Sequence, residues 1–279
     1  MVQEKPLLIL IMEYSHVSKK IRERVLKMIF ESGSSHIGSA FSCVDILTVL
    51  YFNILSIDPK NPLNSDRDRF ILSKGHAASA LYAALAERGF FPEENLDSYC
   101  RDKSNLPGHP TLRCVPGVEA STGSLGHGLA IGSGMAFAGK KDNKNYRVFV
   151  LMSDGECNEG SVWESAMFSA HHKLDNLIGI IDYNKLQAMG RTDEVIGLEP
   201  LRKKWESFGW AVEETDGHNH SEIEKRLKKT PFKKDKPSLI IAHTTKGKGV
   251  SFMEDKLEWH YKSPDKEQFA KALKELRQL

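Results

Sequence analysis

The sequence predicts an α/β fold with one doubly wound, mostly parallel sheet and helices on both faces. Short apolar stretches rich in β-branched residues alternate along the chain with stretches of helical periodicity. Small polar groups repeatedly follow the apolar stretches, where ligands bind in open α/β sheets. At 279 residues, the chain is long enough to bury a substantial core. We find no internal repeat or linker, so a single domain over residues 1–279 is the simplest organisation.

The predicted sheet has a β-α-β unit at its centre. A strand over Arg147–Met152 precedes a helix over Gly160–His172, and a second strand covers Leu177–Asp182. Asp154 follows the first strand, and Asn184 follows the second. Because the carboxyl ends of parallel strands share one edge of the sheet, we expect these two side chains to lie close together.

A carboxylate beside an amide oxygen indicates a site for a hard divalent cation. Oxygen ligands suit Mg²⁺, with Ca²⁺ or Mn²⁺ as alternatives, and phosphate oxygens and water would complete the shell. Gly155 would let a bulky anion approach the backbone closely. Asp154 and Asn184 therefore predict a metal-bridged diphosphate. The structural alternative is an Asp-Gly turn that binds nothing.

Before this unit, apolar periodicity predicts several helices and one strand. The helices are expected over 14–31, 44–54, 77–88, 92–100 and 129–138. Ser42 and Asp45 resemble the start of the second of these helices. The strand over Arg69–Leu72 would place His76 at the edge of the sheet that carries Asp154.

Glycine-rich loops adjoin two further predicted elements. Residues 121–128 form a loop before a helix, and such a loop can hold a diphosphate with its backbone N–H groups. After the central unit, strands are expected over 210–215 and 238–243, and helices over 221–229 and 266–276. The second of these strands runs into Thr-Thr-Lys-Gly-Lys-Gly, which places Lys246 beside glycines at a strand end.

Composition and charge exclude several other classes of protein. The net charge of +2 comes from interspersed lysines and acids, so the sequence shows no basic patch for nucleic acid. The four cysteines are widely separated and indicate neither a zinc site nor disulfides. The apolar run 7–12 is too short for a membrane span and lacks a cleavage site, so we expect a cytoplasmic chain without membrane contact.

Several of the eleven histidines fall in loop-like stretches. The four that share this setting are His36, His76, His109 and His260. Neutral imidazoles that converge on one cleft suit proton transfer to and from sugar hydroxyl groups. A lone loop histidine is more often structural, and we expect His218 and His220 to be surface turn residues.

The order and spacing of these motifs resemble those of a known family. Asn184 follows Asp154 by 30 residues, which is similar to the thiamine-diphosphate signature, although Ser153 stands where that signature has its first glycine. Almost the whole chain resembles the N-terminal, diphosphate-binding half of transketolase, in the form encoded as a separate subunit. The matching motifs are Ser-His-Ile-Gly-Ser at 35–39, Ser-Lys-Gly-His at 73–76, Pro-Gly-His-Pro at 107–110, Thr-Gly-Ser-Leu-Gly at 122–126, Asp-Gly-Glu at 154–156, Asn-Lys at 184–185, Lys-Gly at 246–247 and Trp-His at 259–260.

The resemblance implies a role for each matching residue. The implied metal ligands are Asp154, Asn184 and the main-chain carbonyl of Leu186. The implied cofactor contacts are Ser39, His76, Gly123, Ser124, Leu125, Gly155, Asn184, Lys246 and His260. The implied catalytic residues, which face the sugar substrate, are His36, His109 and His260. Glu159 would lie toward the activating glutamate of a partner chain.

The implied reaction is transfer of a two-carbon ketol unit from a ketose to an aldose, usually as phosphates. Thiamine diphosphate supplies the carbanion chemistry, and this family uses a glutamate from a separate pyrimidine-binding domain. We expect that domain and the C-terminal domain to lie on another chain, a C-terminal transketolase subunit that joins this one in an α₂β₂ assembly. The substrates would be pentose-phosphate intermediates or specialised sugars from a polysaccharide or sulfosugar route.

Two other functions remain open at this point. Another thiamine-dependent enzyme, such as a deoxyxylulose-phosphate synthase or a 2-oxo acid dehydrogenase α chain, would share the metal motif but lack the set of histidines. A non-catalytic binding or regulatory subunit would keep the same fold. Loss of Asp154 or Asn184 would favour that function, and both residues are present.

Overall fold

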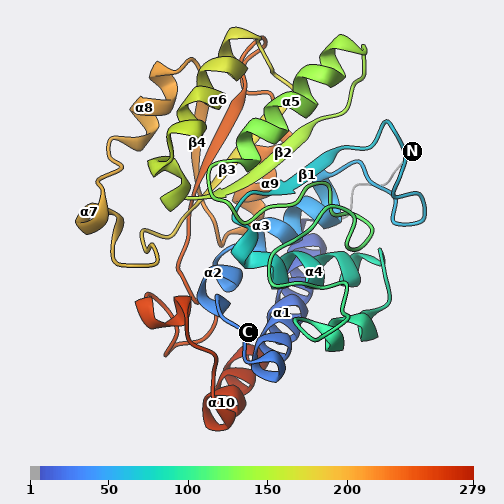
Figure 1. Ribbon diagram of the computed structural model, residues 1–279, viewed down its shortest axis with the longest axis vertical. Helices are drawn as coiled ribbons and strands as arrows, with labels where there is room; N and C mark the ends of the chain where they lie inside the picture. Colours follow the sequence, from blue (N-terminus) through green and yellow to red (C-terminus); the bar gives the residue numbers. More distant parts are fainter. Residues whose placement is uncertain (1–6) are drawn as a thin grey trace.

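Five parallel strands form a single sheet in the order β1-β2-β3-β5-β4 (Figure 1). The computed structural model describes residues 7–279, and the side chains of residues 13–279. The strands are β1 (Arg69–Leu72), β2 (Val148–Ser153), β3 (Leu177–Tyr183), β4 (Ala211–Asp216) and β5 (Ser238–His243). Each strand begins and ends within one residue of its predicted position, so the predicted sheet is confirmed.

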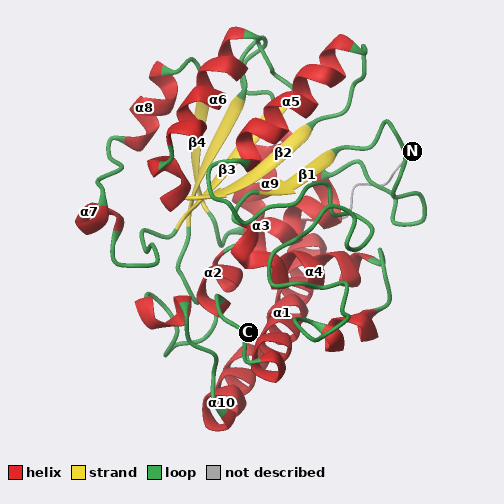
Figure 2. Cartoon of the chain, in the orientation of Figure 1, coloured by secondary structure: helices red, strands yellow, loops and turns green. Residues whose placement is uncertain are grey.

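Helices lie on both sides of the sheet, which confirms the doubly wound fold (Figure 2). The helices are α1 (Leu7–Ser32), α2 (Ile37–Ser42), α3 (Val44–Val49), α4 (Ala78–Arg88), α5 (Gly128–Lys141), α6 (Gly160–His171), α7 (Thr192–Val195), α8 (Leu201–Ser207), α9 (His220–Lys228) and α10 (Lys266–Arg277). Helices α5, α6 and α8 share one core with the sheet, whereas α1 to α4, α9 and α10 share the other.

The two cores meet opposite faces of the same strands. In β2, Phe149 and Leu151 belong to the core beneath α1 to α4. Val150 and Met152, which alternate with them, belong to the core beneath α5, α6 and α8. All four side chains are fully buried. Strands buried on both faces in this way are characteristic of parallel sheets covered by helices.

The order of the strands explains why the helices divide between the two faces. The chain moves from β2 to β3 and on to the edge strand β4, with α6 and α8 on one face. It then steps back to β5, between β3 and β4. A right-handed crossover in the reverse direction places α9 on the opposite face. The carboxyl ends of all five strands therefore meet at one edge.

Helix α3 begins at Val44, as predicted, but the predicted arrangement of Ser42 and Asp45 at its start is wrong, because no side chain caps it. The chain is already helical over Ile37–Ser42, before α3 begins. Ser42 Oγ donates to the Asp182 carboxylate at 2.5 Å, and the Asp45 carboxylate accepts from Arg22. Both side chains are buried and make long-range contacts instead of capping the helix.

Other differences from the predicted elements are smaller. Helices α7 and α8 were not predicted, and residues 93–98 and 257–260 form 3-10 helices. Helix α1 begins at Leu7, so it includes the apolar run 7–12, whose side chains lie outside the described ones. Within residues 7–279, no helix is both long and apolar enough to cross a lipid bilayer. The cytoplasmic location stays a prediction.

Candidate active site

A cavity of about 460 Å³ lies where the carboxyl ends of β1, β2 and β3 meet the loops that follow them. Its volume is within the range of cofactor sites in other proteins. We name it the strand-end cavity. The predicted site residues that line it are His36, Ser39, His76, His109, Gly123, Leu125, Asp154, Gly155, Asn184, Leu186 and His260. Glu159 lines it as well.

Asp154 and Asn184 follow two neighbouring strands, as predicted. Asp154 Oδ2 accepts from the Lys185 N–H at 2.7 Å, and its Oδ1 accepts from the Gly155 N–H at 2.7 Å. Asn184 Oδ1 accepts from the Leu186 N–H at 3.0 Å. The Asp154 carboxylate therefore joins the turn after β2 to the turn after β3. Both turns line the strand-end cavity.

The Asp154 carboxylate lies in an environment that disfavours its negative charge. The residue is only 2% exposed, and burial together with the nearby Asp182 carboxylate raises its pKa to about 6. The two backbone N–H groups oppose this shift only partly. A cation bound in the cavity would stabilise the ionised form of Asp154, because an opposite charge close to a carboxylate lowers its pKa.

Lys246 reaches the site from the loop after β5. Its side chain is fully buried, and its Nζ lies 3.2 Å from the main-chain oxygens of Leu186 and Gln187. The same Nζ lies 3.1 Å from His260 Nδ1. Burial, and then the charge of Lys74, lower the pKa of Lys246 to about 8. A bound anion would therefore be favoured beside this buried cation.

The four predicted histidines converge on the cavity from separate segments of the chain. The ring centroid of His36 lies 5.4 Å from that of His76, 6.0 Å from that of His109 and 4.9 Å from that of His260. The backbone helps to fix this arrangement, because the His36 N–H donates to the His260 carbonyl at 3.0 Å. His36 has a left-handed φ of 74° just before α2.

Burial keeps these imidazoles neutral at physiological pH. Burial, followed by the charges of His109 and Lys246, lowers the pKa of His36 to about 4. Burial, and then Lys246, lower the pKa of His260 to about 3. The pKa of His76 is well below its ordinary value, mainly because the ring is buried. Neutral imidazoles can both accept and donate a hydrogen bond, as contacts with sugar hydroxyl groups require.

We expect His36 to stay neutral until the pH falls to about 4. In the unfolded chain this imidazole takes up a proton near its ordinary pKa of about 6.5, so its contribution to folding stability decreases as the pH falls from there to about 4. A ¹⁵N NMR titration of the imidazole nitrogens measures the midpoint, with the signal assigned by its loss in His36→Gln. A midpoint near the ordinary value would contradict the buried position of the ring.

Glu156 holds three segments together beneath the cavity. It is fully buried, and its Oε1 accepts from the Gly126 N–H at 3.0 Å and from Ser73 Oγ. Its Oε2 accepts from the Ser153 N–H at 2.9 Å. The carboxylate thereby connects the glycine-rich loop to the ends of β1 and β2. The loop packs so closely on the β1 end that a Cβ at Gly75 would lie 2.7 Å from a backbone nitrogen.

A buried ion pair that the sequence did not reveal lies beside the cavity. Lys74 and Asp182 are both fully buried, and Lys74 Nζ donates to Asp182 Oδ2 and to the Ser39 carbonyl. Thr244 Oγ1 donates to the other carboxylate oxygen of Asp182. Although burial acts to lower it, Asp182 raises the pKa of Lys74 above its ordinary value. Lys74 also lines the cavity.

Two predicted cofactor contacts do not line the cavity surface. Ser124 is exposed and does not contribute to the lining, whereas Lys246 lies buried directly behind it. Two residues that line the cavity were not predicted as site residues. Each carries a buried polar atom that has no hydrogen-bond partner within the described part of the chain. These atoms are Asn158 Oδ1 and Gln187 Nε2. Polar atoms of this kind usually have a partner, which a bound ligand would supply.

The parallel sheet and the histidine-lined cavity at its strand ends define a domain of the thiamine-diphosphate-binding type. Residues 14–276 match the family model described as transketolase, thiamine diphosphate binding domain. The chain therefore belongs to the transketolase family, as the sequence predicted.

Two relatives match this chain over almost the whole length of both proteins. An apulose-4-phosphate transketolase subunit from Phocaeicola vulgatus is 46% identical over 259 residues, which are 93% of this chain and 92% of that one. The 6-deoxy-6-sulfo-D-fructose transketolase subunit SqwG of a Clostridium species is 43% identical, over 95% of this chain and 96% of that one.

Solved structures of transketolases share the fold. The transketolase of Campylobacter jejuni aligns with a TM-score of 0.90 and 32% identity, over 96% of this chain and 43% of that one. The transketolase of Leishmania mexicana aligns with a TM-score of 0.89 and 27% identity, over 95% of this chain and 41% of that one. This chain thus spans about two fifths of the length of these two solved enzymes.

Proposed function

We propose that this chain is the diphosphate-binding subunit of a two-subunit transketolase. In this proposal, residues 1–279 form one domain, and a C-terminal partner subunit supplies the pyrimidine-binding domain. The observation that carries the proposal is the joint position of Asp154 and Asn184 at neighbouring strand ends, in a cavity backed by the buried cation of Lys246.

The residues of the strand-end cavity fit a Mg²⁺ ion and a diphosphate. Asp154, Asn184 and the Leu186 carbonyl would hold the ion, and Lys246 would neutralise the charge of the diphosphate. The three proposed metal ligands each offer a hard oxygen atom, which is the type of ligand that Mg²⁺ prefers. No group of three His, Cys, Asp or Glu side chains within the described residues is arranged to hold a metal ion. The phosphate oxygens would therefore complete the coordination shell.

The glycine-rich loop and Gly155 would allow the cofactor to lie close to the backbone. A Cβ atom at Gly155 would meet no heavy atom nearer than 3.5 Å, so the cavity is open at that point. Gly123 has a φ of 144°, which favours glycine, and His109 lies directly against it. When bound, thiamine diphosphate would stabilise the carbanion formed from the sugar. Ser39, His76, Ser124 and Leu125 are the remaining proposed cofactor contacts.

Three neutral histidines would position the sugar and move its protons. His36, His109 and His260 lie around the same cavity, and the pKa of each is lowered by burial. Each ring can accept a proton from a hydroxyl group, or donate a hydrogen bond to it, without a prior change of charge. The geometry therefore supports a polyhydroxylated substrate in the proposed transfer of a two-carbon ketol unit.

The rim of the cavity supports the need for a partner chain. Met189 and Ile196 line the cavity, yet their side chains are 79% and 59% exposed. Apolar side chains exposed together beside a binding site are typical of surfaces that another protein covers. Glu159 also lines this cavity and would face the activating glutamate of the partner. An α₂β₂ assembly is the proposed arrangement.

Relatives support a sugar phosphate or a sulfosugar as the substrate. Two of them are named for apulose 4-phosphate and for 6-deoxy-6-sulfo-D-fructose, which are specialised sugars. We propose that the donor of this enzyme is a ketose that carries an anionic group at the end remote from its carbonyl.

Calorimetric titration with thiamine diphosphate, of the chain alone and with its co-purified partner subunit, tests the proposal most simply. We expect binding in the presence of Mg²⁺ and a marked loss of affinity when EDTA removes the metal. A non-catalytic subunit of the same fold that has lost the cofactor would show no Mg²⁺-dependent binding, either alone or with the partner. That result would overturn the proposed function.

A further inference from the structure

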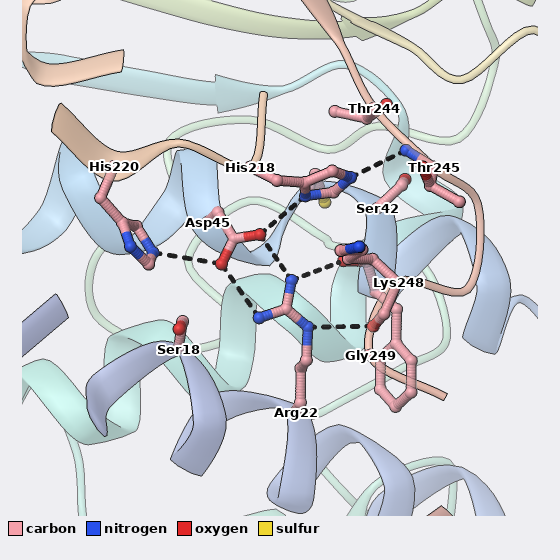
Figure 3. Close-up of polar contacts among 12 residues, drawn as sticks. Ser18, Arg22, Ser42, Asp45, His218, His220, Thr244, Thr245, Lys248 and Gly249 are labelled. Atoms are coloured by element: carbon pink, nitrogen blue, oxygen red, sulfur yellow. Dashed lines mark hydrogen bonds and ion pairs between the residues drawn. The ribbon is translucent and has the colours of Figure 1, made fainter. Parts of the chain in front are cut away.

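A buried cluster of charged and polar side chains contacts the loop after β5, of which Thr245 and Lys248 are labelled in Figure 3. We name it the Asp45 cluster, and it consists of Arg22, Asp45, His218 and His220. Asp45 is 4% exposed and Arg22 is 3% exposed. The guanidinium binds both carboxylate oxygens, with Nη1 to Oδ1 at 2.9 Å and Nη2 to Oδ2 at 2.6 Å.

Two histidines are the remaining hydrogen-bond partners of the Asp45 carboxylate in the cluster. His218 Nδ1 lies 2.8 Å from Oδ2, and His220 Nε2 lies 3.1 Å from Oδ1. The prediction that both are surface turn residues is therefore wrong: His220 is buried at the start of α9, and His218, which does lie in a turn, is mostly buried. Although burial acts to raise it, Arg22 and the two histidines hold the pKa of Asp45 well below its ordinary range. The carboxylate is thus a fixed negative charge with four donors.

The hydrogen bonds of His218 define which nitrogen carries its proton. The Thr245 backbone N–H, which can only donate, lies 2.8 Å from His218 Nε2. Nε2 is therefore the acceptor, and the proton of the neutral ring is on Nδ1, facing Asp45. Asp45 thereby fixes both the orientation and the tautomer of His218, as carboxylates do for histidines that bind metals.

The cluster binds the loop on both sides of Lys246. His218 accepts from the N–H of Thr245, the residue before Lys246. Arg22 Nε donates at 3.1 Å to the carbonyl of Lys248, two residues after it. Figure 3 shows that the two side chains making these contacts both bind the Asp45 carboxylate. We name residues 244–249 the Lys246 loop.

The position of this loop determines where the ammonium group of Lys246 lies. Its Nζ contacts main-chain oxygens in the wall of the cavity, and its side chain is fully buried. A buried side chain of this length has little freedom to compensate for a displacement of its backbone. A shift of the Lys246 loop would therefore move the cation away from the site.

We propose that Asp45 is a positioning residue, which acts through His218 and Arg22 to hold the Lys246 loop in the geometry that binds the diphosphate. The inference rests on the proposed function, since it takes Lys246 as the diphosphate cation. Asp45 itself does not line the strand-end cavity. Its effect would be on affinity, with the chemistry of the histidines unchanged.

The two histidines of the cluster offer a matched pair of variants. His218→Phe removes the acceptor for the Thr245 N–H, whereas His220→Phe removes a comparable bond to Asp45 that does not involve the Lys246 loop. Hydrogen exchange of the full chain, followed by mass spectrometry, measures protection of the peptide over 244–249. Calorimetry measures the affinity for thiamine diphosphate with Mg²⁺.

We expect His218→Phe to accelerate exchange in the Lys246 loop and to weaken cofactor affinity by about 10- to 100-fold, the range found when an outer-shell partner of a metal ligand is lost. His220→Phe should change neither quantity. Equal effects of the two variants, or an unchanged loop in His218→Phe, would overturn the proposal. If the unsubstituted chain binds no cofactor, the proposed function fails, and the exchange result still decides whether His218 of the Asp45 cluster holds the loop.

A second variant tests the contact between Arg22 and the Lys246 loop, in case His218→Phe does not fold. Arg22→Lys keeps a cation beside Asp45 but lacks the planar guanidinium, whose Nε donates to the Lys248 carbonyl while its two terminal nitrogens bind Asp45, so we expect the bond to the loop to be lost. The expected result is faster exchange in the Lys246 loop with a folded core, judged by an unchanged circular dichroism spectrum. Protection equal to that of the unsubstituted chain would contradict the role of Arg22.

Discussion

Asp154→Ala is expected to abolish Mg²⁺-dependent binding of thiamine diphosphate, with a loss of affinity of at least about 100-fold, or about 2.7 kcal/mol. The variant removes the only carboxylate that we assign to the metal. It also removes the acceptor that joins the turn after β2 to the Lys185 N–H. Titration calorimetry at fixed Mg²⁺ measures the loss. Asp154→Asn should retain part of the turn geometry and still lose metal-dependent affinity, because it lacks the negative charge.

Asp175→Ala is the matched control for this experiment. Asp175 lies at the opposite end of β3, where it pairs with Lys140 at 2.6 Å, far from the strand-end cavity. Its removal should leave the affinity for thiamine diphosphate within about twofold, because surface ion pairs contribute little. Binding that survives in Asp154→Ala as well as in the control would show that the metal is held elsewhere.

Ketol transfer is expected to need the partner subunit, with a rate about 10²- to 10⁴-fold lower for this chain alone. The reason is chemical, because the glutamate beside the cofactor's pyrimidine ring would come from that subunit. A positioned acid or base of this kind contributes about 10²- to 10⁴-fold to a rate. The exposed apolar rim formed by Met189 and Ile196 would become buried on assembly.

Reconstitution with the C-terminal subunit measures this requirement directly. Each chain is assayed alone and then mixed, with a panel of ketose and aldose phosphates that includes apulose 4-phosphate, and with the sulfosugar 6-deoxy-6-sulfofructose. Activity should appear only in the mixture and should be lost with Asp154→Ala. Full activity of the unaccompanied chain would contradict the division of the active site between two subunits.

Local signals in the sequence were sufficient to predict the sheet and most of the cavity. All five strands were predicted to within one residue, and β2 and β3 most directly, because fully buried strands need β-branched and other apolar side chains. Once the strands were known to be parallel, Asp154 and Asn184 had to lie at the same edge. The prediction that His36, His76 and His109 line the cavity depended more on the family resemblance, because loops have no periodicity from which the position of a side chain could be predicted.

Long-range polar contacts were the part that could not be predicted from the sequence. His218 and His220 lie 173 and 175 residues from Asp45, and nothing in their local sequence indicates that they contact the same carboxylate. Ser42 resembled a helix cap because capping is a local property, but its hydroxyl group donates to Asp182, which is 140 residues away. In both cases the contact forms because the polar side chains are buried together. Whether a polar side chain is buried depends on the whole fold and not on its local sequence.

The most direct measurement of the central claim is a crystal structure of this chain with thiamine diphosphate and Mg²⁺. We predict one metal ion, bound by Asp154, Asn184, the Leu186 carbonyl and two diphosphate oxygens at about 2.1 Å, with Lys246 beside the same diphosphate. A diphosphate bound away from the ends of β2 and β3, or one held without a metal at these residues, would contradict the account.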